Sequence, residues 1–362
     1  MKEVDIVVIG GGPAGLSAAV HAAKMGAGVL LLERSQALGG QLVKQTHKFF
    51  GSRQEFAGER GFVIAHTLME QIGQQDNIEV WTNATALGYY PDGILTVKRN
   101  ETFRTLRPRK LIVTTGASEK TLAFPNNDLP GIYGAGAVQT LMNLYGVMPA
   151  KRVLMVGAGN IGVIVAYQLL QAGVEVVAVI EAAPRIGGYW VHASKIRRCG
   201  VPILTGHTIR QAHGTTQLTG VTVCRLDEKW NMIPGTDTLF EVDGLCLAVG
   251  LSPLTELLWQ AGCKMNYVPE LGGYVPWRNE DLQTTHKNVY VAGDVAGVEE
   301  ASAAMVEGKL AGLAAAFALN RQTADFAADY RAAKQQLNAL RSGPLSAKVC
   351  NGLCKVMLEE AM

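Results

Sequence analysis

Two glycine-rich segments of the sequence have the spacing that binds the phosphates of a dinucleotide. In the first, Gly10-Gly11-Gly12-Pro13-Ala14-Gly15 follows an apolar run and opens a helix-like run, and Glu33 lies about 20 residues further on. Gly10 permits a tight turn, Gly12 lets the backbone approach a pyrophosphate, and Gly15 lets the helix pack close to the strand. The N–H groups and positive dipole end at the helix start attract phosphates. Glu33 can accept hydrogen bonds from ribose hydroxyls, so the segment predicts a dinucleotide site.

A second segment, Gly157-Ala158-Gly159-Asn160-Ile161-Gly162, repeats this pattern after another apolar run, and Glu181 ends the next such run. An acid at that place favours an unphosphorylated ribose 2′-hydroxyl and so NAD over NADP, although Arg185 could partly serve a 2′-phosphate. Trp190 and His192 could line this pocket, meet a partner or pack in the core. A domain that binds no nucleotide, or a different one such as ATP, is the alternative interpretation.

The elements that would position these residues occur twice in the same order. Each set is a strand, a glycine-rich turn, a helix and a second strand, followed by a meander and a strand that ends in glycine. The first set has strands at 4–9, 29–33 and 111–117, a helix at 14–25 and a meander at 78–106; the second has strands at 153–156, 174–181 and 244–250, a helix at 164–172 and a meander at 203–242. A strand at 288–292, a helix at 298–319 and a polar helical tail at 325–362 are predicted to follow.

Length and composition agree with two globular domains. The chain has 362 residues, of which 48% are hydrophobic and 18% charged, and this is more than one compact core normally takes. The net charge of +2 gives no electrostatic footprint for nucleic acid or an anionic membrane. The sequence shows no secretory leader pattern and no run of about 18 uncharged apolar residues, and its six cysteines are scattered. We therefore expect a cytoplasmic protein with reduced thiols, no membrane span and no nucleic-acid partner.

Further motifs resemble the thioredoxin-reductase-type flavoproteins. The resemblance rests on Gly39-Gly40-Gln41-Leu42 with Thr46 and Phe50-Gly51, on the strand end Thr114-Thr115-Gly116-Ala117, and on Val289-Tyr290-Val291-Ala292-Gly293-Asp294. It implies that the first site binds FAD rather than NAD, with Asp294 holding the ribityl chain. The helix from about Val298 would direct its N-terminus to the flavin and favour negative charge there. His47 would then lie near the flavin, or be a hydrogen-bonded structural residue.

The redox dithiol of thioredoxin reductases is missing from this chain. Those enzymes carry Cys-x-x-Cys early in the second domain, where this chain reads Gly131-Ile132-Tyr133-Gly134-Ala135-Gly136-Ala137. Other disulfide reductases have their pair soon after the first unit, but no cysteine occurs here before Cys199. A dithiol relay to a protein disulfide is therefore excluded.

A closer resemblance extends over almost the whole chain. It is carried by Phe124-Pro125-Asn126-Asn127-Asp128-Leu129-Pro130-Gly131-Ile132-Tyr133, by Gly250-Leu251-Ser252-Pro253, by Gly293-Asp294-Val295-Ala296-Gly297-Val298-Glu299-Glu300-Ala301 and by Glu307-Gly308-Lys309-Leu310-Ala311-Gly312. These segments resemble the FAD- and nicotinamide-binding subunits of multi-subunit amine and amino-acid dehydrogenases: opine oxidases, hydrogen cyanide synthase, dye-linked proline dehydrogenase and heterotetrameric sarcosine oxidase. The resemblance implies a hetero-oligomer with a second flavoprotein subunit that oxidises the amine. An iron–sulfur subunit is a further candidate partner.

Many of these relatives add a cysteine-rich iron–sulfur region, for which this chain offers only Cys350 and Cys354. Because four thiolates are the usual complement of a cluster, structural or incidental thiols are the favoured interpretation. A cluster completed by a partner's ligands, and a redox pair, are the alternatives.

These observations predict an α/β fold of two Rossmann-like dinucleotide-binding domains with three-stranded antiparallel meanders, the second inserted in the first. Residues 1–120 and 270–325 would form the FAD-binding domain, 121–269 the NAD(H)-binding domain and 326–362 a C-terminal helical tail. The expected reaction is hydride exchange between NAD(H) and FAD within an amine or amino-acid dehydrogenase complex. The alternatives are a self-contained NADH-dependent flavin reductase or oxidase, and a non-catalytic nucleotide-binding subunit.

The sequence designates cofactor-binding residues but no catalytic side chain and no metal ligand, since hydride transfer between cofactors does not itself require a protonatable residue. The residues predicted to bind FAD are Gly10, Gly12, Pro13, Ala14, Gly15, Glu33, Arg34, Gly40, Gln41, Thr46, Ala84, Thr115, Gly116, Ala117, Gly293, Asp294, Glu300 and Ala301, and those predicted to bind NAD(H) are Gly157, Gly159, Asn160, Ile161, Gly162, Glu181 and Gly250.

Overall fold

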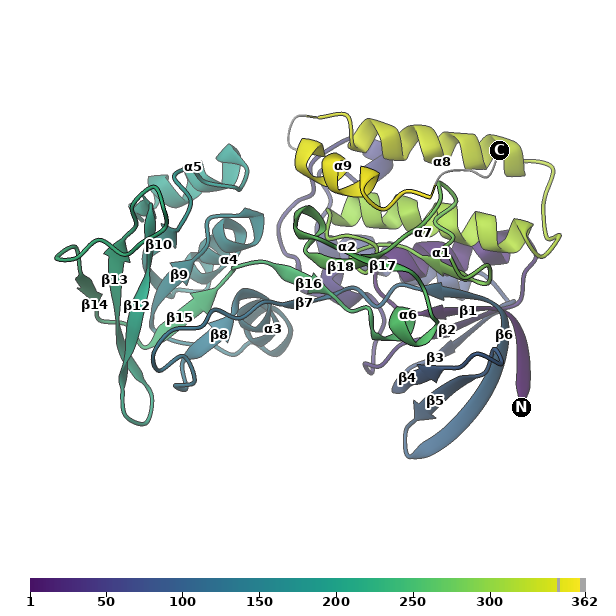
Figure 1. The fold of residues 1–362 in the computed structure, drawn as a ribbon, viewed down its shortest axis with the longest axis horizontal. Helices are drawn as coiled ribbons and strands as arrows, with labels where there is room; N and C mark the ends of the chain where they lie inside the picture. The colour runs from purple at the N-terminus through teal and green to yellow at the C-terminus, as the bar shows by residue number, and fades with distance from the viewer. Residues whose placement is uncertain (344–345, 359–362) are drawn as a thin grey trace. The chain divides into compact units, whose positions relative to one another are not determined.

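The computed structural model describes residues 1–343 and 346–358, which form two compact units (Figure 1). Unit 1 comprises Met1–Val43, Lys48–Ser118 and the described residues from Leu251 onward, and unit 2 comprises Lys44–His47 and Glu119–Gly250. Unit 2 therefore interrupts unit 1 in the sequence. Its limits differ from the predicted domain boundaries, because residues 251–269 and the described residues from 326 onward belong to unit 1.

Unit 1 is built on a parallel sheet with the strand order β3-β2-β1-β6-β19. The strands are β1 (Lys2–Ile9), β2 (Val29–Leu32), β3 (Ile78–Trp81), β6 (Thr102–Val113) and β19 (Val289–Val291). Branched apolar side chains point to both faces, Val7 into one core cluster and Val8 into another, as expected for a sheet covered on both sides. Ile9 pairs with Val113, and Val113 with Val291. The loops that follow these three strands therefore leave the same edge of the sheet.

A three-stranded antiparallel meander extends this sheet. It consists of β4 (Ala84–Tyr89), β5 (Leu95–Arg99) and the first half of β6, whose second half belongs to the parallel part. Tyr89, Leu95 and Val97 are buried in the same cluster as Val7, so the meander covers one face of the sheet.

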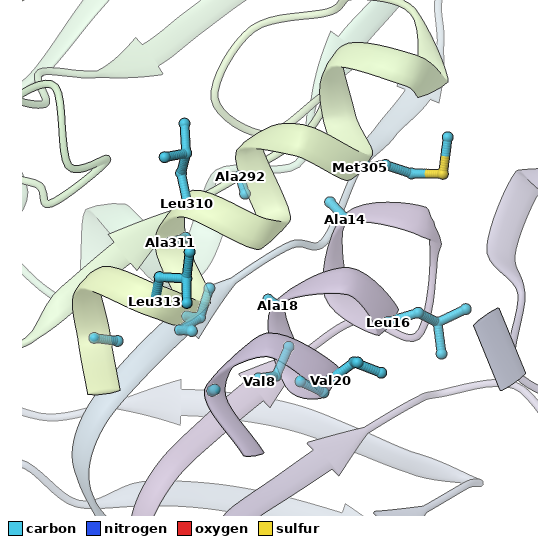
Figure 2. Packing of buried hydrophobic residues seen from close by; sticks show 14 of the residues in the cluster. Val8, Ala14, Leu16, Ala18, Val20, Ala292, Met305, Leu310, Ala311 and Leu313 are labelled. Atoms are coloured by element: carbon cyan, nitrogen blue, oxygen red, sulfur yellow. The ribbon is translucent and has the colours of Figure 1, made fainter. Parts of the chain in front are cut away.

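Three helices cover the opposite face: α1 (Pro13–Lys24), α2 (Gly61–Gly73) and α7 (Ala301–Phe317). Figure 2 shows α1 and α7 side by side, and glycines of α7 permit their close approach. A Cβ on Gly308 would lie 2.1 Å from the carbonyl oxygen of Ala14, and one on Gly312 would lie 2.3 Å from that of Ala18. Real Cβ atoms essentially never come within 3.0 Å of another heavy atom, so only glycine permits these contacts.

Residues 326–343 and 346–358, here called the C-terminal segment, pack against the rest of unit 1. Helix α8 (Phe326–Leu340) buries Ala333 and Leu337 in the cluster formed by α1 and α7. Helix α9 (Ala347–Cys354) places Leu353 against Leu271. The other elements of this unit are β16 (Leu251–Pro253), α6 (Glu256–Gln260), the hairpin β17 (Met265–Val268) and β18 (Gly273–Pro276), and the 3-10 turns η2 (Arg53–Glu55) and η3 (Pro269–Leu271). Strand β7 (Ala117–Glu119) and the 3-10 turn η1 (Gly40–Lys44) begin in unit 1, and their last residues belong to unit 2.

Unit 2 repeats the plan of unit 1 with the strand order β11-β10-β9-β15-β8, all parallel. Its strands are β8 (Ile132–Gly134), β9 (Arg152–Val156), β10 (Glu175–Glu181), β11 (Ile203–Thr205) and β15 (Gly244–Leu247); its meander is β12 (His207–Gly214), β13 (Leu218–Arg225) and β14 (Thr238–Phe240); its helices are α3 (Ala135–Tyr145), α4 (Asn160–Gln171) and α5 (Trp190–Arg198). The predicted fold, two Rossmann-like domains with antiparallel meanders and the second inserted in the first, is confirmed.

Candidate nucleotide-binding sites

The first glycine-rich loop is held in place by Glu33. This buried carboxylate accepts hydrogen bonds from the backbone N–H of Gly11 at 2.7 Å and of Ser35 at 2.8 Å. Each carboxylate oxygen has a second lone pair, so Glu33 can order the loop and still accept a ribose hydroxyl. Ala84 lies beside it, with its N–H donating to the carbonyl of Glu33 at 2.9 Å.

Glycine is required at the two ends of this loop. Gly10 has a φ of +110°, and a Cβ there would lie 2.3 Å from the carbonyl oxygen of Thr114. A Cβ on Gly15 would lie 1.8 Å from the carbonyl oxygen of Gly10. The hydroxyl of Thr114 donates to the carbonyl of Ile9 at 2.8 Å, so the end of β6 is bonded to the start of the loop.

The backbone N–H groups at the start of α1 fit a phosphate. The N-cap of α1 is Gly12, and no side chain caps it. Gly39 donates its N–H to the carbonyl of Gly11 at 2.8 Å, and a Cβ on Gly12 would meet only the Cα of Gly40, at 3.9 Å. The helix start therefore offers donors and a positive dipole end in a loop without side chains, which is a cradle for a pyrophosphate.

The late Gly-Asp motif lies against this loop. A Cβ on Gly293 would lie 2.9 Å from the Cβ of Ala14, so β19 delivers the motif beside the start of α1. Burial, together with the nearby carboxylates of Glu307 and Glu299, raises the pKa of Asp294 to about 6, although Asp294 accepts a hydrogen bond from the N–H of Glu299 at 3.4 Å. A carboxylate that water solvates poorly gains from accepting the hydroxyls of a ribityl chain. The residues present therefore fit FAD.

The other predicted FAD residues belong to unit 1, apart from Thr46. The hydroxyl of Thr115 donates to the carbonyl of Leu254 at 2.7 Å, and Gly116 has a φ of +76°. Glu300 is the N-cap residue of α7 and its side chain does not cap the helix. Arg34, Gln41 and Glu300 are exposed, whereas Ala117 and Ala301 are partly buried.

The second glycine-rich loop repeats the first in detail. Glu181 accepts hydrogen bonds from the N–H of Ala158 at 2.7 Å and of Ala183 at 2.9 Å. A Cβ on Gly162 would lie 1.9 Å from the carbonyl oxygen of Gly157. Gly159 is the N-cap of α4, no side chain caps that helix, and a Cβ on Gly159 would meet nothing within 4 Å. Unit 2 therefore has the same pyrophosphate cradle as unit 1.

A turn that was not predicted from the sequence completes this second site. Gly187 and Gly188 donate their N–H groups to the carbonyl of Ala158 at 3.2 and 2.9 Å, and a Cβ on Gly188 would lie 2.9 Å from the carbonyl carbon of Gly159. The signal was present in the sequence, because this Gly-Gly pair and the pair at 39–40 each begin six residues after their glutamate. Asn160 fixes the end of the turn by accepting a hydrogen bond from the N–H of Tyr189 at 2.8 Å. Ile161 and Trp190 are exposed, with 39% and 72% of their surface accessible.

The segment 44–47 belongs to unit 2 rather than to the unit that holds the FAD motifs. The hydroxyl of Thr46 accepts a hydrogen bond from Gln168 at 2.8 Å, and the rings of His47 and His192 are 6.2 Å apart, edge to face. Burial, then the nearby His192 and Lys195, lowers the pKa of His47 to about 4. A role of Thr46 and His47 beside the flavin therefore stays a prediction.

Two charged residues at the start of α3 were also missed. Glu119 accepts hydrogen bonds from the N–H of Gly136 at 2.6 Å and of Ala137 at 3.2 Å, which satisfies the helix terminus. Lys44 is buried and donates to the carbonyl of Gly136 at 2.9 Å and to Thr140 at 3.2 Å. Burial lowers the pKa of Lys44, and the carboxylate of Glu119 opposes that shift.

Neither a thiol pair nor a metal site accompanies these loops. All six cysteines are free, and Cys350 donates to the carbonyl of Arg341 at 3.4 Å. Within residues 1–343 and 346–358, no three His, Cys, Asp or Glu side chains are grouped to hold a metal ion. Over the same ranges, no helix has the length and apolar character needed to cross a membrane.

Comparison with known sequences extends these findings. The sequence model of the pyridine nucleotide-disulphide oxidoreductase family matches residues 4–308. The A chain of opine oxidase from Agrobacterium tumefaciens (strain Ach5) is 28% identical over 86% of this chain and 65% of its own length. The alpha chain of sarcosine oxidase from Corynebacterium sp. (strain P-1) is 27% identical over 87% of this chain and 33% of its own length. The HcnB chain of hydrogen cyanide synthase from Pseudomonas aeruginosa is 27% identical over 85% of this chain and 69% of its own length. The chain thus spans less than two thirds of the length of the first two of these relatives.

Solved structures share the fold. L-Proline dehydrogenase from P. horikoshii superimposes with a TM-score of 0.72 and 22% identity, over 93% of this chain and 59% of that chain. Thioredoxin reductase from T. acidophilum gives a TM-score of 0.73 and 22% identity, over 88% of this chain and all of that one. With two intact nucleotide loops and a family match over most of its length, this chain is a member of the pyridine nucleotide-disulphide oxidoreductase family, an FAD-dependent oxidoreductase whose cofactors are FAD and a nicotinamide nucleotide.

Proposed function

We propose that this chain is the FAD- and NAD-binding subunit of an amine or amino-acid dehydrogenase complex. When bound, the cofactors exchange a hydride between nicotinamide and flavin, and the protein binds and orients them. Oxidation of an amine to its imine releases two electrons and two protons. A partner flavoprotein would take up the electrons, and FAD held by this chain would supply the route to NAD, whose reduction consumes one of the protons while the other goes to solvent, or to another acceptor.

The start of α3 is the observation that carries this proposal. Thioredoxin reductases have their redox dithiol in this part of the second domain, whereas here the carboxylate of Glu119 and the ammonium of Lys44 occupy the helix terminus. Both side chains form their hydrogen bonds within unit 2. A flavin that receives two electrons must pass them on, and no Cys-x-x-Cys pair stands at the start of α3 to take them. A redox centre on a partner protein supplies that acceptor or donor.

The relatives support the chemical class of the complex. Three of them are named as subunits, of opine oxidase, sarcosine oxidase and hydrogen cyanide synthase. Opines and sarcosine are amino acids with a substituted nitrogen, so the proposed substrate is a secondary amine of that kind or a related amino acid.

The geometry of Glu181 supports NAD over NADP. Its two oxygens are fixed by the N–H groups of Ala158 and Ala183, which holds a negative charge beside the predicted ribose position. That charge accepts a hydrogen bond from a 2′-hydroxyl and repels a 2′-phosphate.

The test is an anaerobic titration of the purified, FAD-loaded chain with NADH, following the visible flavin absorbance. We expect the band to bleach at one equivalent of NADH, and NADPH to require a much higher concentration. Glu181→Ala, which leaves the FAD loop unchanged, is the matched control and should weaken the response to NADH. A band that stays unchanged at saturating NADH would contradict the proposed hydride exchange, and many rapid turnovers with oxygen alone would favour a self-contained oxidase.

The partner is tested separately by purifying the complex from its native source and counting flavins per copy of this chain. We expect a second flavoprotein in the complex and more than one flavin per chain. A complex without one would refute the proposed role in a multi-subunit enzyme even if the NADH titration succeeds.

A further inference from the structure

A cluster of buried charges lies behind the Gly293–Asp294 loop, and one of its members comes from the C-terminal segment. Arg341 follows the last turn of α8. Its guanidinium donates to Glu299 at 2.6 and 3.1 Å and to Glu307 at 2.6 Å. The side chains of Arg341, Glu299 and Glu307 are only 15%, 13% and 4% exposed. Charge-assisted bonds of a forked guanidinium are strong, and they fix the geometry of both partners.

Both carboxylates continue into the predicted FAD site. The second oxygen of Glu307 accepts the N–H of Gly293 at 2.8 Å. The N–H of Glu299 donates to the carboxylate of Asp294 at 3.4 Å. Arg341 is thus connected to the backbone of the loop through Glu307 and to the carboxylate of Asp294, which is predicted to hold the ribityl chain, through Glu299.

The C-terminal segment also covers the second cation of the cluster. Arg278 is 2% exposed, burial lowers its pKa, and its charge acts on Glu307 and Glu299. Its backbone N–H donates to the carbonyl of Val356 at 3.0 Å, and its carbonyl accepts the N–H of Leu358 at 2.9 Å. The charges that act on Asp294 are therefore the carboxylates of Glu299 and Glu307. Two guanidiniums act in turn on these carboxylates, and the C-terminal segment supplies one of them and encloses the other.

We propose that the C-terminal segment contributes to FAD binding and that Arg341 is a positioning residue for the Gly293–Asp294 loop. Through Glu299 and Glu307 it fixes the Gly293–Asp294 loop and balances two negative charges there, so it raises the affinity for FAD and the reduction potential of the bound flavin. The family's sequence model matches residues 4–308, which include Glu299 and Glu307 but not Arg341. The proposal rests on FAD binding in unit 1 and needs neither NAD nor a partner.

The test compares Arg341→Met with Arg331→Met in the FAD-loaded and FAD-free chain. Arg331 lies on α8, is exposed and, among the described residues, donates to the carbonyl of Ala327, so it controls for the loss of a surface arginine. Three quantities are measured: the FAD dissociation constant, the flavin midpoint potential, and the pH at which FAD affinity is half lost.

For Arg341→Met we expect an FAD dissociation constant about tenfold higher or more, because two buried carboxylates lose their partner. The midpoint potential should become more negative, since unbalanced negative charge opposes electron uptake by the flavin. The pH midpoint should move upward, since Asp294 is then surrounded by more negative charge. Arg331→Met should leave all three unchanged.

Rescue separates positioning from a merely structural role. Adding Glu299→Gln to Arg341→Met removes one of the unbalanced charges and should return the potential and the pH midpoint toward the wild-type values. A variant that unfolds at a lower temperature but keeps the wild-type potential, affinity and pH midpoint overturns the proposal.

If Arg341→Met does not fold, Arg341→Lys carries the comparison, because a point charge cannot engage both carboxylates as the fork does. We then expect a dissociation constant a few-fold higher, and wild-type values for Arg341→Lys overturn the proposal. Failure of the wild-type chain to bind FAD would instead refute the first site itself.

Discussion

The close packing of α1 and α7 makes a sharp prediction about glycine. Gly308→Ala adds one methyl group in the middle of α7, where alanine is intrinsically the better helix former by about 1 kcal/mol. The added Cβ would lie 2.1 Å from the carbonyl oxygen of Ala14 and 2.8 Å from its carbonyl carbon. Backbone atoms cannot rotate away as a flexible side chain can, so α7 must move outward by about 1 Å to restore an ordinary contact.

The size of the effect follows from two opposing terms. Overpacking of this kind costs about 1–3 kcal/mol, and a gap of about 1 Å along the rest of the interface loses a quarter to a half of the dispersion energy of each contact. The gain in helix propensity offsets part of this, so we expect Gly308→Ala to destabilise unit 1 by about 2 kcal/mol. For a unit of this size that lowers the midpoint of thermal unfolding by about 4–8 °C.

The assay is thermal unfolding of the FAD-free chain, with Gly73→Ala as the control. Gly73 is the last residue of α2, and a Cβ there would meet nothing within 4 Å, so this variant should be as stable as the wild type or slightly more stable. FAD affinity should also fall in Gly308→Ala, because Ala14 lies in the phosphate loop. A Gly308→Ala protein as stable as Gly73→Ala would show that the two helices are not packed by backbone contact.

Three further predictions concern the carboxylates of the two sites. Asp294→Asn should stabilise the FAD-free chain at pH 7.5 by on the order of 2–3 kcal/mol but not below pH 4. The reason is that the pKa of Asp294 is raised to about 6 in the folded chain. The protonated side chain therefore adds to the free energy of unfolding at a pH below its pKa in the unfolded chain, and this stabilisation is lost as the pH rises through about 6. Equal unfolding midpoints of Asp294→Asn and the wild type at both pH values would contradict the prediction. FAD affinity of the wild-type chain should decline as the pH falls through about 6, as protonation removes the acceptor, and fluorescence titrations across pH 5–8 check this. Glu33→Ala should weaken FAD binding about tenfold to a hundredfold, since the N–H groups of Gly11 and Ser35 lose their acceptor, and an unchanged dissociation constant would show that Glu33 does not order the loop.

Local rules explain what the sequence predicted well. The strands and helices of both Rossmann-like folds were predicted from apolar runs and glycine spacing, because a few neighbouring residues determine each strand, turn and helix start. The two glutamates were expected to bind ribose hydroxyls, and the structure adds that each holds its own glycine loop through backbone N–H groups. That second role explains why an acid at this position matters before any nucleotide is bound.

Features that join distant parts of the chain were not predicted. Arg341 pairs with Glu299 over 42 positions and with Glu307 over 34, and no periodicity in the sequence signals such a pair. Lys44 meets Gly136 across 92 positions for the same reason. The C-terminal residues were therefore interpreted as a tail, because their polar helical pattern does not show that Ala333 and Leu337 enter the core of unit 1.

The start of α3 and the buried charge cluster near α7 both favour a flavin that exchanges electrons with a second protein rather than with a dithiol of this chain. A dithiol enzyme needs an exposed, reactive pair beside its flavin, whereas here Glu119 and Lys44 satisfy that helix terminus and leave no group to be oxidised. The buried charges lie instead in unit 1, which is predicted to bind FAD. There two guanidiniums and two carboxylates are buried near Asp294. Removing that many charges from water costs free energy. A function that depends on the buried charges, such as setting the reduction potential of a flavin, would explain why they are present. A flavin that exchanges electrons with a second protein must have a potential matched to that protein, so we expect the C-terminal segment and the partner to act on the same quantity.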